Sequence, residues 1–268
     1  MIEWRIGCQE QLLPGNTLLE KWQFAQEAGF DGIELRGRGD FAFAERLPEL
    51  RQARDQGVPM PTECVEMRHF IGAFDDEQRS DAIRQMISQL SVMAEIGGEV
   101  AMTPAAHGMF SRRLPPFEPP RSAENDRQVL LEALGQLGEH ARSEGVTICL
   151  EPLNRYEDHM VNTLDAAASL CRELGLASVR VAADTYHMNI EEADPAAALL
   201  KAGEWLGHVQ LSDSNRMEPG AGHIDWAVHL AALEAAGYGG WLAFECRLTG
   251  PAEAVLPAAI SRIRQAGR

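Results

Sequence analysis

Polar side chains end several apolar runs in the second half of this sequence. Glu151 closes TICLE, Asp184 closes VRVAAD, Gln210 lies inside HVQLSD, and Glu245 closes WLAFE. A carboxylate at the end of a buried strand is costly unless its charge is compensated. One divalent metal ion shared by these groups would compensate them directly. Each carboxylate alone fits a helix cap or an arginine partner at least as well, and only the whole set favours a metal site.

The predicted ligands offer oxygen atoms only. Glutamate, aspartate and glutamine oxygens form a hard ligand set, which suits Mn²⁺ or Mg²⁺ better than Zn²⁺, with Co²⁺ as a substitute. We therefore expect one divalent ion with positions open for substrate oxygens. His208 is an alternative to Gln210, because residues two apart on a strand face the same side. Gln210 is favoured because it lies nearer the carboxyl end of its strand.

Such strand ends meet only in a suitable scaffold. Short apolar runs alternate about eight times with longer amphipathic stretches, which is typical of βα units around a parallel sheet. A length of 268 residues suits one complete barrel. No GxGxxG follows the first strand, which counts against an open doubly wound sheet. The expected fold class is α/β, a (β/α)8 TIM barrel forming a single domain over residues 1–268.

The expected elements follow from hydrophobic periodicity. The predicted strands are Trp4–Cys8, Gly32–Leu35, Met60–Val65, Val100–Thr103, Thr147–Glu151, Arg180–Asp184, His208–Leu211 and Trp241–Glu245. The clearest predicted helices are Leu18–Glu27, Ser80–Glu95, Asn125–Glu144, Thr163–Leu174 and Ala252–Arg264. The proline-rich segment Ala105–Arg121 is predicted to be an extended loop after the fourth strand, placed to cover the mouth of the barrel.

Composition narrows the partners. A formal net charge of −16 and a pI of about 4.9 repel nucleic acids and anionic membranes. No window approaches the roughly 18 to 20 apolar residues needed to span a bilayer. The five cysteines form no CxxC pair and are expected to be reduced thiols. We expect a soluble, cytoplasmic enzyme with a small-molecule substrate and no nucleic-acid or membrane partner.

Longer motifs make the prediction more specific. EPLNRYEDHMVNT (151–163), DTYHMNIEE (184–192) and HVQLSDSNRMEPGAGHIDW (208–226) resemble the signatures of the sugar isomerase/epimerase superfamily of xylose isomerase-like barrels, especially the tagatose and psicose 3-epimerases. The resemblance is close over the second half of the chain and extends to the first half only as a fold pattern.

The resemblance implies roles for individual residues. Glu151, Asp184 and Glu245 match metal ligands of that family, and the two glutamates also match its acid/base pair. The substrate-binding residues implied by the same motifs are Glu157, His187 and Arg216. The family's second histidine in an HxH strand is replaced here by Gln210, which is instead similar to the metal ligand of hydroxypyruvate isomerases.

These residues imply a mechanism. A metal that chelates a carbonyl and its neighbouring hydroxyl would stabilise a cis-enediolate. With Glu151 and Glu245 on opposite faces, removing a proton on one face and returning it on the other would epimerise a ketose at C3. Return to the adjacent carbon would isomerise a sugar or hydroxypyruvate. His187 would orient the enediolate oxygen, although it also fits a structural histidine, and Arg216 would supply fixed positive charge.

Other functions and residues remain open at this point. A metal-dependent dehydratase or lyase shares the first step, whereas an endonuclease IV-type enzyme and a non-catalytic sugar-binding protein fit poorly. A homodimer or tetramer is usual for similar proteins. Asp225 is expected to cap a helix beside His223. Further residues that either line the mouth or are ordinary loop residues are Glu63, Glu66, His69 and His107.

Overall fold

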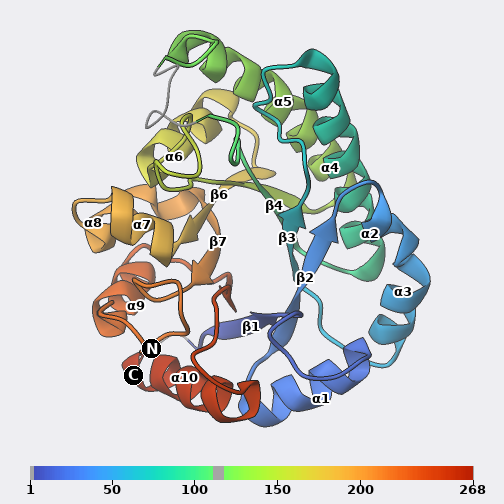
Figure 1. Ribbon diagram of the computed structural model, residues 1–268, viewed down its shortest axis with the longest axis vertical. Coiled ribbons are helices and arrows are strands. Elements are labelled where there is room, and N and C mark those ends of the chain that lie inside the picture. The colour runs from blue at the N-terminus through green and yellow to red at the C-terminus, as the bar shows by residue number, and fades with distance from the viewer. Residues whose placement is uncertain (1–2, 111–117, 268) are drawn as a thin grey trace.

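The computed structural model describes residues 3–110 and 118–267, and its strands form a closed parallel barrel in chain order (Figure 1). β1 pairs with β8, which closes the sheet and confirms the predicted (β/α)8 fold. The strands are β1 (Arg5–Gln9), β2 (Gly32–Arg38), β3 (Thr62–Glu66), β4 (Val100–Pro104), β5 (Thr147–Glu151), β6 (Val179–Asp184), β7 (Leu206–Leu211) and β8 (Trp241–Phe244).

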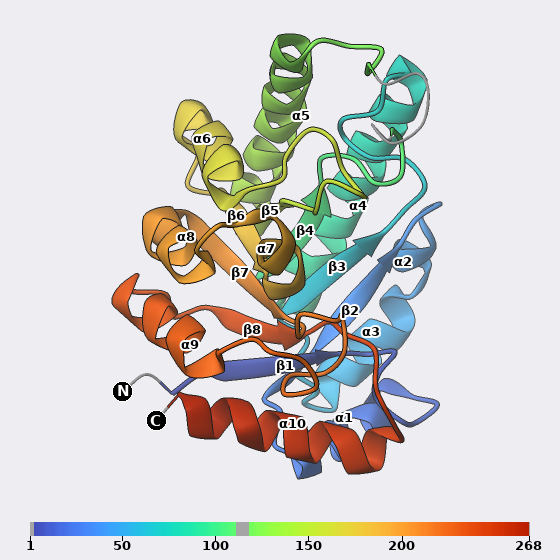
Figure 2. The same cartoon turned by 60° about the vertical axis from the view of Figure 1, so that its left-hand side comes forward.

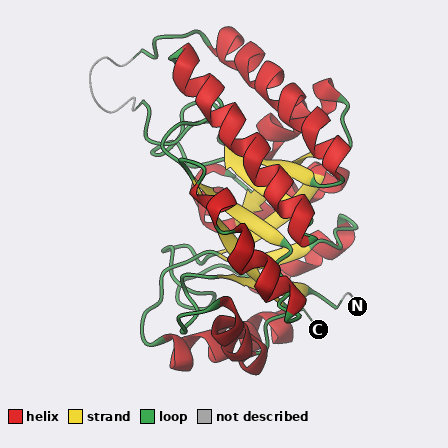
Figure 3. Cartoon of the chain, turned by 90° about the vertical axis from the view of Figure 1, so that its right-hand side faces the viewer, coloured by secondary structure: helices red, strands yellow, loops and turns green. Residues whose placement is uncertain are grey.

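Helices surround the strands on the outside of the barrel (Figure 3). They are α1 (Leu18–Ala28), α2 (Ala42–Glu45), α3 (Leu47–Asp55), α4 (Asp76–Ile96), α5 (Ala123–Glu144), α6 (Leu164–Leu174), α7 (Thr185–Glu191), α8 (Pro195–Ala202), α9 (Trp226–Ala235) and α10 (Ala252–Ala266), with a 3-10 turn at Gly203–Trp205.

Side-chain caps set where several helices begin. Thr17 and Glu20 form a reciprocal capping box at the start of α1, and Thr163 accepts a hydrogen bond from the third residue of α6. Asp225 caps α9 by accepting from the amide of Val228 at 3.2 Å, which confirms the predicted cap. The loop that carries the site's arginine therefore ends at a defined residue.

The predicted strands are all present, with ends shifted by a few residues. β2 continues to Arg38, beyond the predicted end at Leu35, and β7 begins at Leu206 and not at His208. The short helices α2, α3, α7 and α8 were not among the predicted ones, because about two turns show too little periodicity. α7 matters most, since it begins directly after Asp184 and carries a site residue.

Apolar side chains form two separate cores. The main core lies between the sheet and the helices. A much smaller core inside the barrel consists of Val100, Met102, Cys149 and Ala182. The barrel interior also holds polar side chains, because Glu34 on β2 meets His208 and Gln210 on β7 there. The barrel thus buries hydrogen-bonded side chains beneath its strand ends.

The two ends of the barrel differ. The chain termini lie side by side (Figure 1, Figure 2), where Arg264 donates to the carbonyl of Trp4 at 3.3 Å and to Asp31 at 2.8 Å. Long loops gather on another side of the molecule (Figure 3). Of the predicted loop Ala105–Arg121, residues 111–117 lie outside the described part.

All five cysteines are free, as expected. Among the described helices, none has the length and apolarity to cross a bilayer.

Candidate active site at the carboxyl ends of the strands

The predicted metal ligands lie on neighbouring strands at one end of the barrel. Glu151 is the last residue of β5, Asp184 is the last residue of β6, and Glu245 directly follows β8. Gln210 on β7 is the register partner of Asp184 on one side and of Ala243 on the other. Because side chains alternate along a strand, Glu245 faces the same side as Ala243, toward the barrel interior. The sheet therefore collects residues that are far apart in sequence.

Arg216 lies between the carboxylates of two strands. Its guanidinium contacts Asp184 at 2.5 Å and Glu245 at 3.0 Å, and it also stacks over the ring of Tyr186 at 5.0 Å. Although burial opposes its charge, Asp184 and Glu245 raise the pKa of Arg216 well above its usual value. A fixed positive charge thus faces the cavity.

Arg216 has a left-handed backbone with φ of 64°, which is unusual for a residue other than glycine. The loop keeps this conformation because the buried carboxylate of Asp213 accepts hydrogen bonds from several of its amides. The donors are Ser214 N at 2.8 Å, Gly220 N at 2.7 Å, Ile224 N at 3.1 Å and Trp226 Nε1 at 3.3 Å. Although burial opposes ionisation, these donors hold the pKa of Asp213 below its usual value. Asp213 was not predicted from the sequence.

His187 lies on α7 and lines the cavity. Its Nδ1 accepts from the backbone amide of Asn154 at 3.0 Å, and burial lowers its pKa, which favours the neutral ring. A neutral imidazole that accepts at Nδ1 carries its proton on Nε2. That nitrogen lies 3.8 Å from Oε1 of Glu151. The geometry supports the predicted role of orienting an oxygen atom.

Glu157 lies at the mouth of the site. Its carboxylate accepts from the amide of Asn154 at 2.8 Å and lies 3.6 Å from Nε2 of His107. The interaction with His107 is the main cause that lowers the pKa of Glu157 to about 2, and the same pair raises the pKa of His107. Glu157 is therefore an ionised hydrogen-bond acceptor at neutral pH, suited to hold a hydroxyl group.

The two glutamates at the strand ends are difficult to ionise. Burial raises the pKa of Glu151 well above its usual value, and the nearby charges of Glu245 and Asp184 raise it further. Burial also raises the pKa of Glu245 to about 8, against the opposing effect of Arg216. Asp184 differs, because Arg216 keeps its pKa low despite burial. Carboxyl groups with such different environments are suited to acid/base work near neutral pH.

These side chains share one cavity of about 240 Å³. Its lining combines the predicted residues with apolar ones: Glu151, Glu157, His187, Arg216, Glu245, Cys64, Phe70, His107 and Leu153. Asp184 and Gln210 do not line the cavity and lie beneath it. Glu66 belongs to the wall, whereas Glu63 is buried behind β3 and His69 pairs with Asp81 at 2.9 Å. A chamber that holds the carboxyl groups of Glu151 and Glu245 beside the neutral imidazole of His187 and the guanidinium of Arg216 can move a proton beside a carbonyl.

Comparison with known proteins agrees with this geometry. The family model for the xylose isomerase-like TIM barrel matches residues 22–266. The 3-dehydro-D-guloside 4-epimerase of Escherichia coli K12 is 38% identical over 253 residues, which cover 93% of this chain and 95% of that protein. The chain belongs to the xylose isomerase-like TIM barrel family. A D-psicose 3-epimerase of Enterocloster bolteae is 36% identical over 230 residues, 79% of this chain and 71% of that protein.

A solved structure extends the agreement within the family. The crystal structure of a 3-keto-D-glucoside 4-epimerase from Escherichia coli matches with a TM-score of 0.91 and 36% identity, over 98% of this chain and 100% of that one. These relatives confirm the resemblance read from the motifs and identify this xylose isomerase-like barrel as an enzyme of the isomerase and epimerase class.

The site has atoms that fit a divalent cation. One oxygen each of Glu151 and Asp184 and one nitrogen of His187 lie within 4.8 Å of one another. His187 is a poor ligand in this xylose isomerase-like barrel, because its Nδ1 is engaged and its Nε2 carries the proton. Among the described residues, Oε2 of Glu245 and Oε1 of Gln210 have no hydrogen-bond partner. A cation bound by these oxygens would replace the proton that burial otherwise favours.

His208, the alternative ligand, is turned to another partner. Its Nε2 lies 2.7 Å from Oε2 of Glu34, deep in the barrel and without solvent exposure. Gln210 lies one pleat nearer the carboxyl end of the strand, so the geometry favours it as the ligand. The sequence prediction missed Glu34, Asn154 and Asp213. Asn154 and Asp213 lie inside the EPLNR and SDSNR stretches, so their motifs were the available signal.

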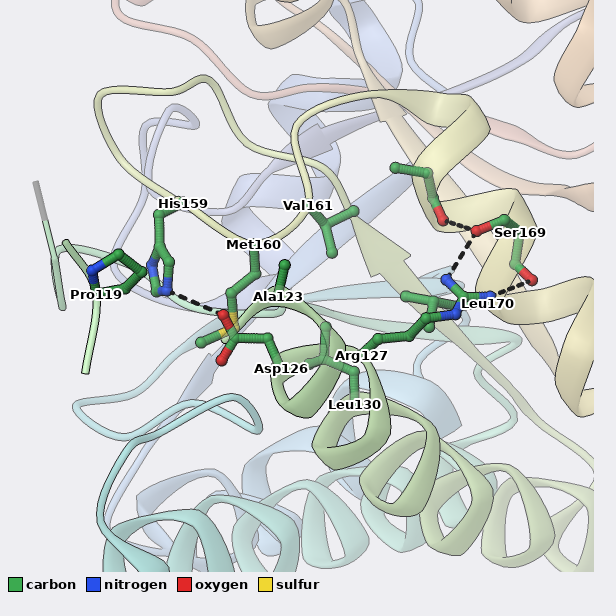
Figure 4. Close-up of a pocket in the computed structure, with 11 residues that line it drawn as sticks. Pro119, Ala123, Asp126, Arg127, Leu130, His159, Met160, Val161, Ser169 and Leu170 are labelled. Atoms are coloured by element: carbon green, nitrogen blue, oxygen red, sulfur yellow. Dashed lines mark hydrogen bonds and ion pairs between the residues drawn. The ribbon is translucent and has the colours of Figure 1, made fainter. Parts of the chain in front are cut away.

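A second pocket, of about 190 Å³, lies beside α5 and α6 (Figure 4). Arg127 donates there to the hydroxyl of Ser169 at 3.0 Å, and His159 lies 3.5 Å from Asp126. Among the described residues that line it, none belongs to the predicted site. Arg127 forms an ion pair with Glu173 and Asp126 forms one with Arg121, so the charges are already compensated and we assign no chemistry to this pocket.

Proposed function

We propose that this enzyme is a divalent-metal-dependent epimerase of keto-sugars, which inverts a hydroxyl-bearing carbon next to a ketone. The observation that carries the proposal is the placement of Glu151 and Glu245 in one cavity with Arg216 and His187 between or beside them. Two carboxyl groups in one cavity provide the proton acceptor and donor that inversion needs.

The metal would be held by Glu151, Asp184, Gln210 and Glu245. Their oxygen atoms suit Mn²⁺ or Mg²⁺, with Co²⁺ as a substitute. When bound, such an ion supplies Lewis-acid polarisation of a substrate carbonyl. Arg216 now neutralises Asp184 and Glu245, and it would turn its charge toward the substrate once a cation compensates them.

Proton transfer would be carried out by the two glutamates. Glu151 enters from β5 and Glu245 from the end of β8, so a planar enediolate bound between them would present one face to each. One carboxylate removes the proton from carbon, and the other carboxylic acid returns a proton to the opposite face. The exchange requires that one of the two carboxyl groups carries a proton when the substrate is bound.

The remaining residues would hold the substrate's oxygens. His187 presents Nε2–H toward the same space as Glu151 and would donate to the developing oxyanion. Arg216 would add positive charge beside Glu245, and the ionised Glu157 would accept a hydrogen bond from a more distant hydroxyl. The site therefore has a distinct partner for each oxygen near the reacting carbon.

The substrate could place its ketone at either of two positions. In a ketose the inverted carbon is C3, next to the ketone at C2. In a 3-keto-glycoside it is C4, next to the ketone at C3. The 38% identity to a 3-dehydro-D-guloside 4-epimerase over 93% of the chain supports the second form, and the D-psicose 3-epimerase relative supports the first. Gln210 in the ligand set favours a hydroxypyruvate isomerase as a second candidate.

Proton exchange in deuterated water would test the proposal. Enzyme loaded with Mn²⁺ is given 3-keto-glucosides, ketoses, aldoses and hydroxypyruvate, and NMR follows each product. We expect deuterium at the carbon beside the ketone, with inversion. Conversion of hydroxypyruvate alone would favour the second candidate, loss of water or cleavage would identify a lyase, and absence of exchange with every substrate would contradict the proposal.

The proposal also covers the partners, the location and the oligomeric state of the enzyme. We expect a small-molecule substrate, a cytoplasmic location and a homodimer or homotetramer, and no nucleic-acid or membrane partner. The net charge of −16 supports the exclusion of polyanions. Size-exclusion chromatography with light scattering would determine the oligomeric state.

A further inference from the structure

A fully buried glutamate lies beneath the candidate metal site. Glu34 on β2 has no solvent exposure and accepts a hydrogen bond from each of its polar neighbours. The donors are Gln9 Nε2 at 3.1 Å and Gln210 Nε2 at 2.8 Å to Oε1, and Thr62 Oγ1 at 2.8 Å and His208 Nε2 at 2.7 Å to Oε2. Donors from β1, β3 and β7 thus converge on one carboxylate, which has no need of a metal for compensation.

This contact fixes the orientation of the Gln210 side chain. A carboxylate only accepts hydrogen bonds, so the Gln210 carboxamide must present its NH2 group to Glu34. The carboxamide is planar, and its oxygen therefore points away from Glu34. That oxygen is buried and has no hydrogen-bond partner among residues 3–110 and 118–267.

The register shows which residues share the space on this side. Gln210 is the partner of Asp184 across β6 and β7, and Glu245 lies two residues after Ala243, the partner of Gln210 on β8. All these side chains face the barrel interior. A buried amide oxygen aimed away from Glu34, on the strand between those of Asp184 and Glu245, is an unused ligand atom.

We propose that Glu34 is a positioning residue: it holds the carboxamide of Gln210 so that Oε1 faces Asp184 and Glu245 and serves as a ligand for the divalent metal. This inference rests on the proposed metal-dependent function. Without Glu34 the carboxamide loses the partner that distinguishes its nitrogen from its oxygen. The NH2 group would then face the cation in part of the molecules, and a cation is not bound by a nitrogen that carries two protons.

The carboxylate of Glu34 could also accept a hydrogen bond from an imidazole at position 210. A histidine there would donate Nδ1–H to the carboxylate and leave Nε2 with its lone pair toward the metal, an arrangement that orients many metal-bound histidines. A leucine would fill similar space but offer no ligand atom. Substitutions at position 210 therefore probe the same contact from the other side.

The test measures metal affinity and not turnover. Metal-free wild type and Glu34→Gln are titrated with Mn²⁺ by calorimetry, and the Co²⁺ forms are compared by visible absorption, which responds to the number and geometry of ligands. We expect Glu34→Gln to bind Mn²⁺ about 10 to 100 times more weakly, the usual effect of losing an outer partner of a ligand, with an altered Co²⁺ spectrum. A folded variant with unchanged affinity and spectrum would overturn the inference.

Glu63→Gln is the matched control. Glu63 is equally buried, lies on the neighbouring strand β3, and has no hydrogen-bond partner among the described residues. Its substitution removes a buried carboxyl group without touching Gln210, so Mn²⁺ affinity and the Co²⁺ spectrum should stay as in the wild type. A loss as large as that of Glu34→Gln would mean that any buried charge acts in the same way, and the inference would be wrong.

Position 210 keeps the inference testable if Glu34→Gln does not fold. We expect Gln210→His to keep Mn²⁺ binding within about 10-fold of the wild type and Gln210→Leu to lose it by more than that. Wild-type affinity in Gln210→Leu would show that Oε1 is not a ligand and would overturn the inference. The proposed function fails differently: wild type would then bind no divalent metal, or would exchange no proton when loaded.

Discussion

This barrel holds a fully buried carboxylate, Glu34, and a pair of carboxyl groups that line the cavity, Glu151 and Glu245, and the two are compensated in different ways. On β2, Glu34 is surrounded by donors from three other strands. On β5 and after β8, Glu151 and Glu245 have raised pKa values, and Oε2 of Glu245 has no partner among the described residues. The charge of Glu34 is compensated fully by hydrogen bonds within the protein. The charges of Glu151 and Glu245 are compensated only by protons, by Arg216 or by a cation, which suits these groups to proton transfer.

This difference in charge compensation indicates which part of the barrel carries the function. The strands of a closed barrel are equivalent in backbone geometry, so chemistry depends on where the side chains leave charge uncompensated. In the proposed function, strands β5 to β8 and the loop after β7 supply the reactive groups, whereas β1 to β3 supply the residues that hold them in place. The predictions that follow test whether this division holds.

Metal removal should have the largest effect. Dialysis against EDTA is expected to abolish turnover, and Mn²⁺ should restore it. Bound metal at about 100 times its Kd stabilises a protein by about 2.7 kcal/mol, so the melting temperature should fall on the order of 5–10 °C. Full activity and unchanged melting in protein shown to be metal-free by elemental analysis would remove the basis of the comparison.

Glu245→Gln should follow in size. The amide keeps a possible ligand oxygen but loses the proton donor and acceptor, so kcat/KM should fall about 10²- to 10⁴-fold. The variant should still exchange deuterium at the reacting carbon, because Glu151 can remove and return a proton on one face. This residual exchange should occur without inversion. The control is Glu66→Gln, which changes another glutamate of the cavity wall and should stay within a few-fold of the wild type. Near wild-type turnover in metal-loaded Glu245→Gln would refute the acid/base assignment.

Asp213→Asn should have an intermediate effect. An asparagine NH2 group would face one of the amides that Asp213 now accepts from, so the loop should shift and carry Arg216 with it. We expect kcat/KM to fall roughly 10- to 100-fold, as for small misplacements of a catalytic group, and the free energy of unfolding to fall by about 1.5–3 kcal/mol.

The same loop offers a control for this variant. Asp225→Asn keeps a good helix cap at the start of α9, and both kinetics and stability should remain close to those of the wild type. If Asp213→Asn also kept the wild-type kcat and KM, the loop would not need its buried carboxylate to place Arg216.

Much of this division could be predicted from the sequence. The strands were evident because short apolar runs recur at the spacing of βα units, and polar residues that end such runs were expected to meet at one end of a barrel. Glu151, Asp184, Gln210 and Glu245 all lie at that end. Their assignment as ligands and as acid/base groups stays a prediction until metal and kinetic data exist.

The residues that were missed act through contacts between distant segments. Glu34 lies within the predicted strand Gly32–Leu35, but its partner His208 is 174 positions away. No local pattern reports such a contact. Asp213 was missed for another reason, because its role depends on the path of a loop that periodicity does not describe. Helix α7 was not predicted, because two turns of helix show no distinct hydrophobic periodicity.

The smallest effect on kcat/KM is expected for Glu63→Gln. This variant tests whether an uncompensated buried carboxyl group is by itself enough for catalysis. Both carboxyl oxygens of Glu63 are buried without a hydrogen-bond partner among the described residues. Burial raises its pKa well above the usual value, as it does for Glu151 and Glu245. Unlike them it lies outside the cavity: a Cβ on Gly37 would lie only 1.4 Å from its Oε1, so its carboxyl group packs directly against β2. Missing compensation alone therefore should not make a residue catalytic, and Glu63→Gln should leave kcat/KM unchanged.

Its effect should appear instead in the pH dependence of stability. A carboxyl group whose pKa is raised on folding binds its proton more tightly in the folded state, so wild-type stability should fall as the pH rises above about 4.5, the unfolded value. Glutamine resembles the protonated acid and does not titrate. The melting temperature of Glu63→Gln should therefore match the wild type near pH 4 and exceed it increasingly toward pH 8, by a few degrees for each kcal/mol. A constant difference across this range would mean that Glu63 is ionised in the folded protein, and that an unseen partner compensates it as fully as its neighbours compensate Glu34.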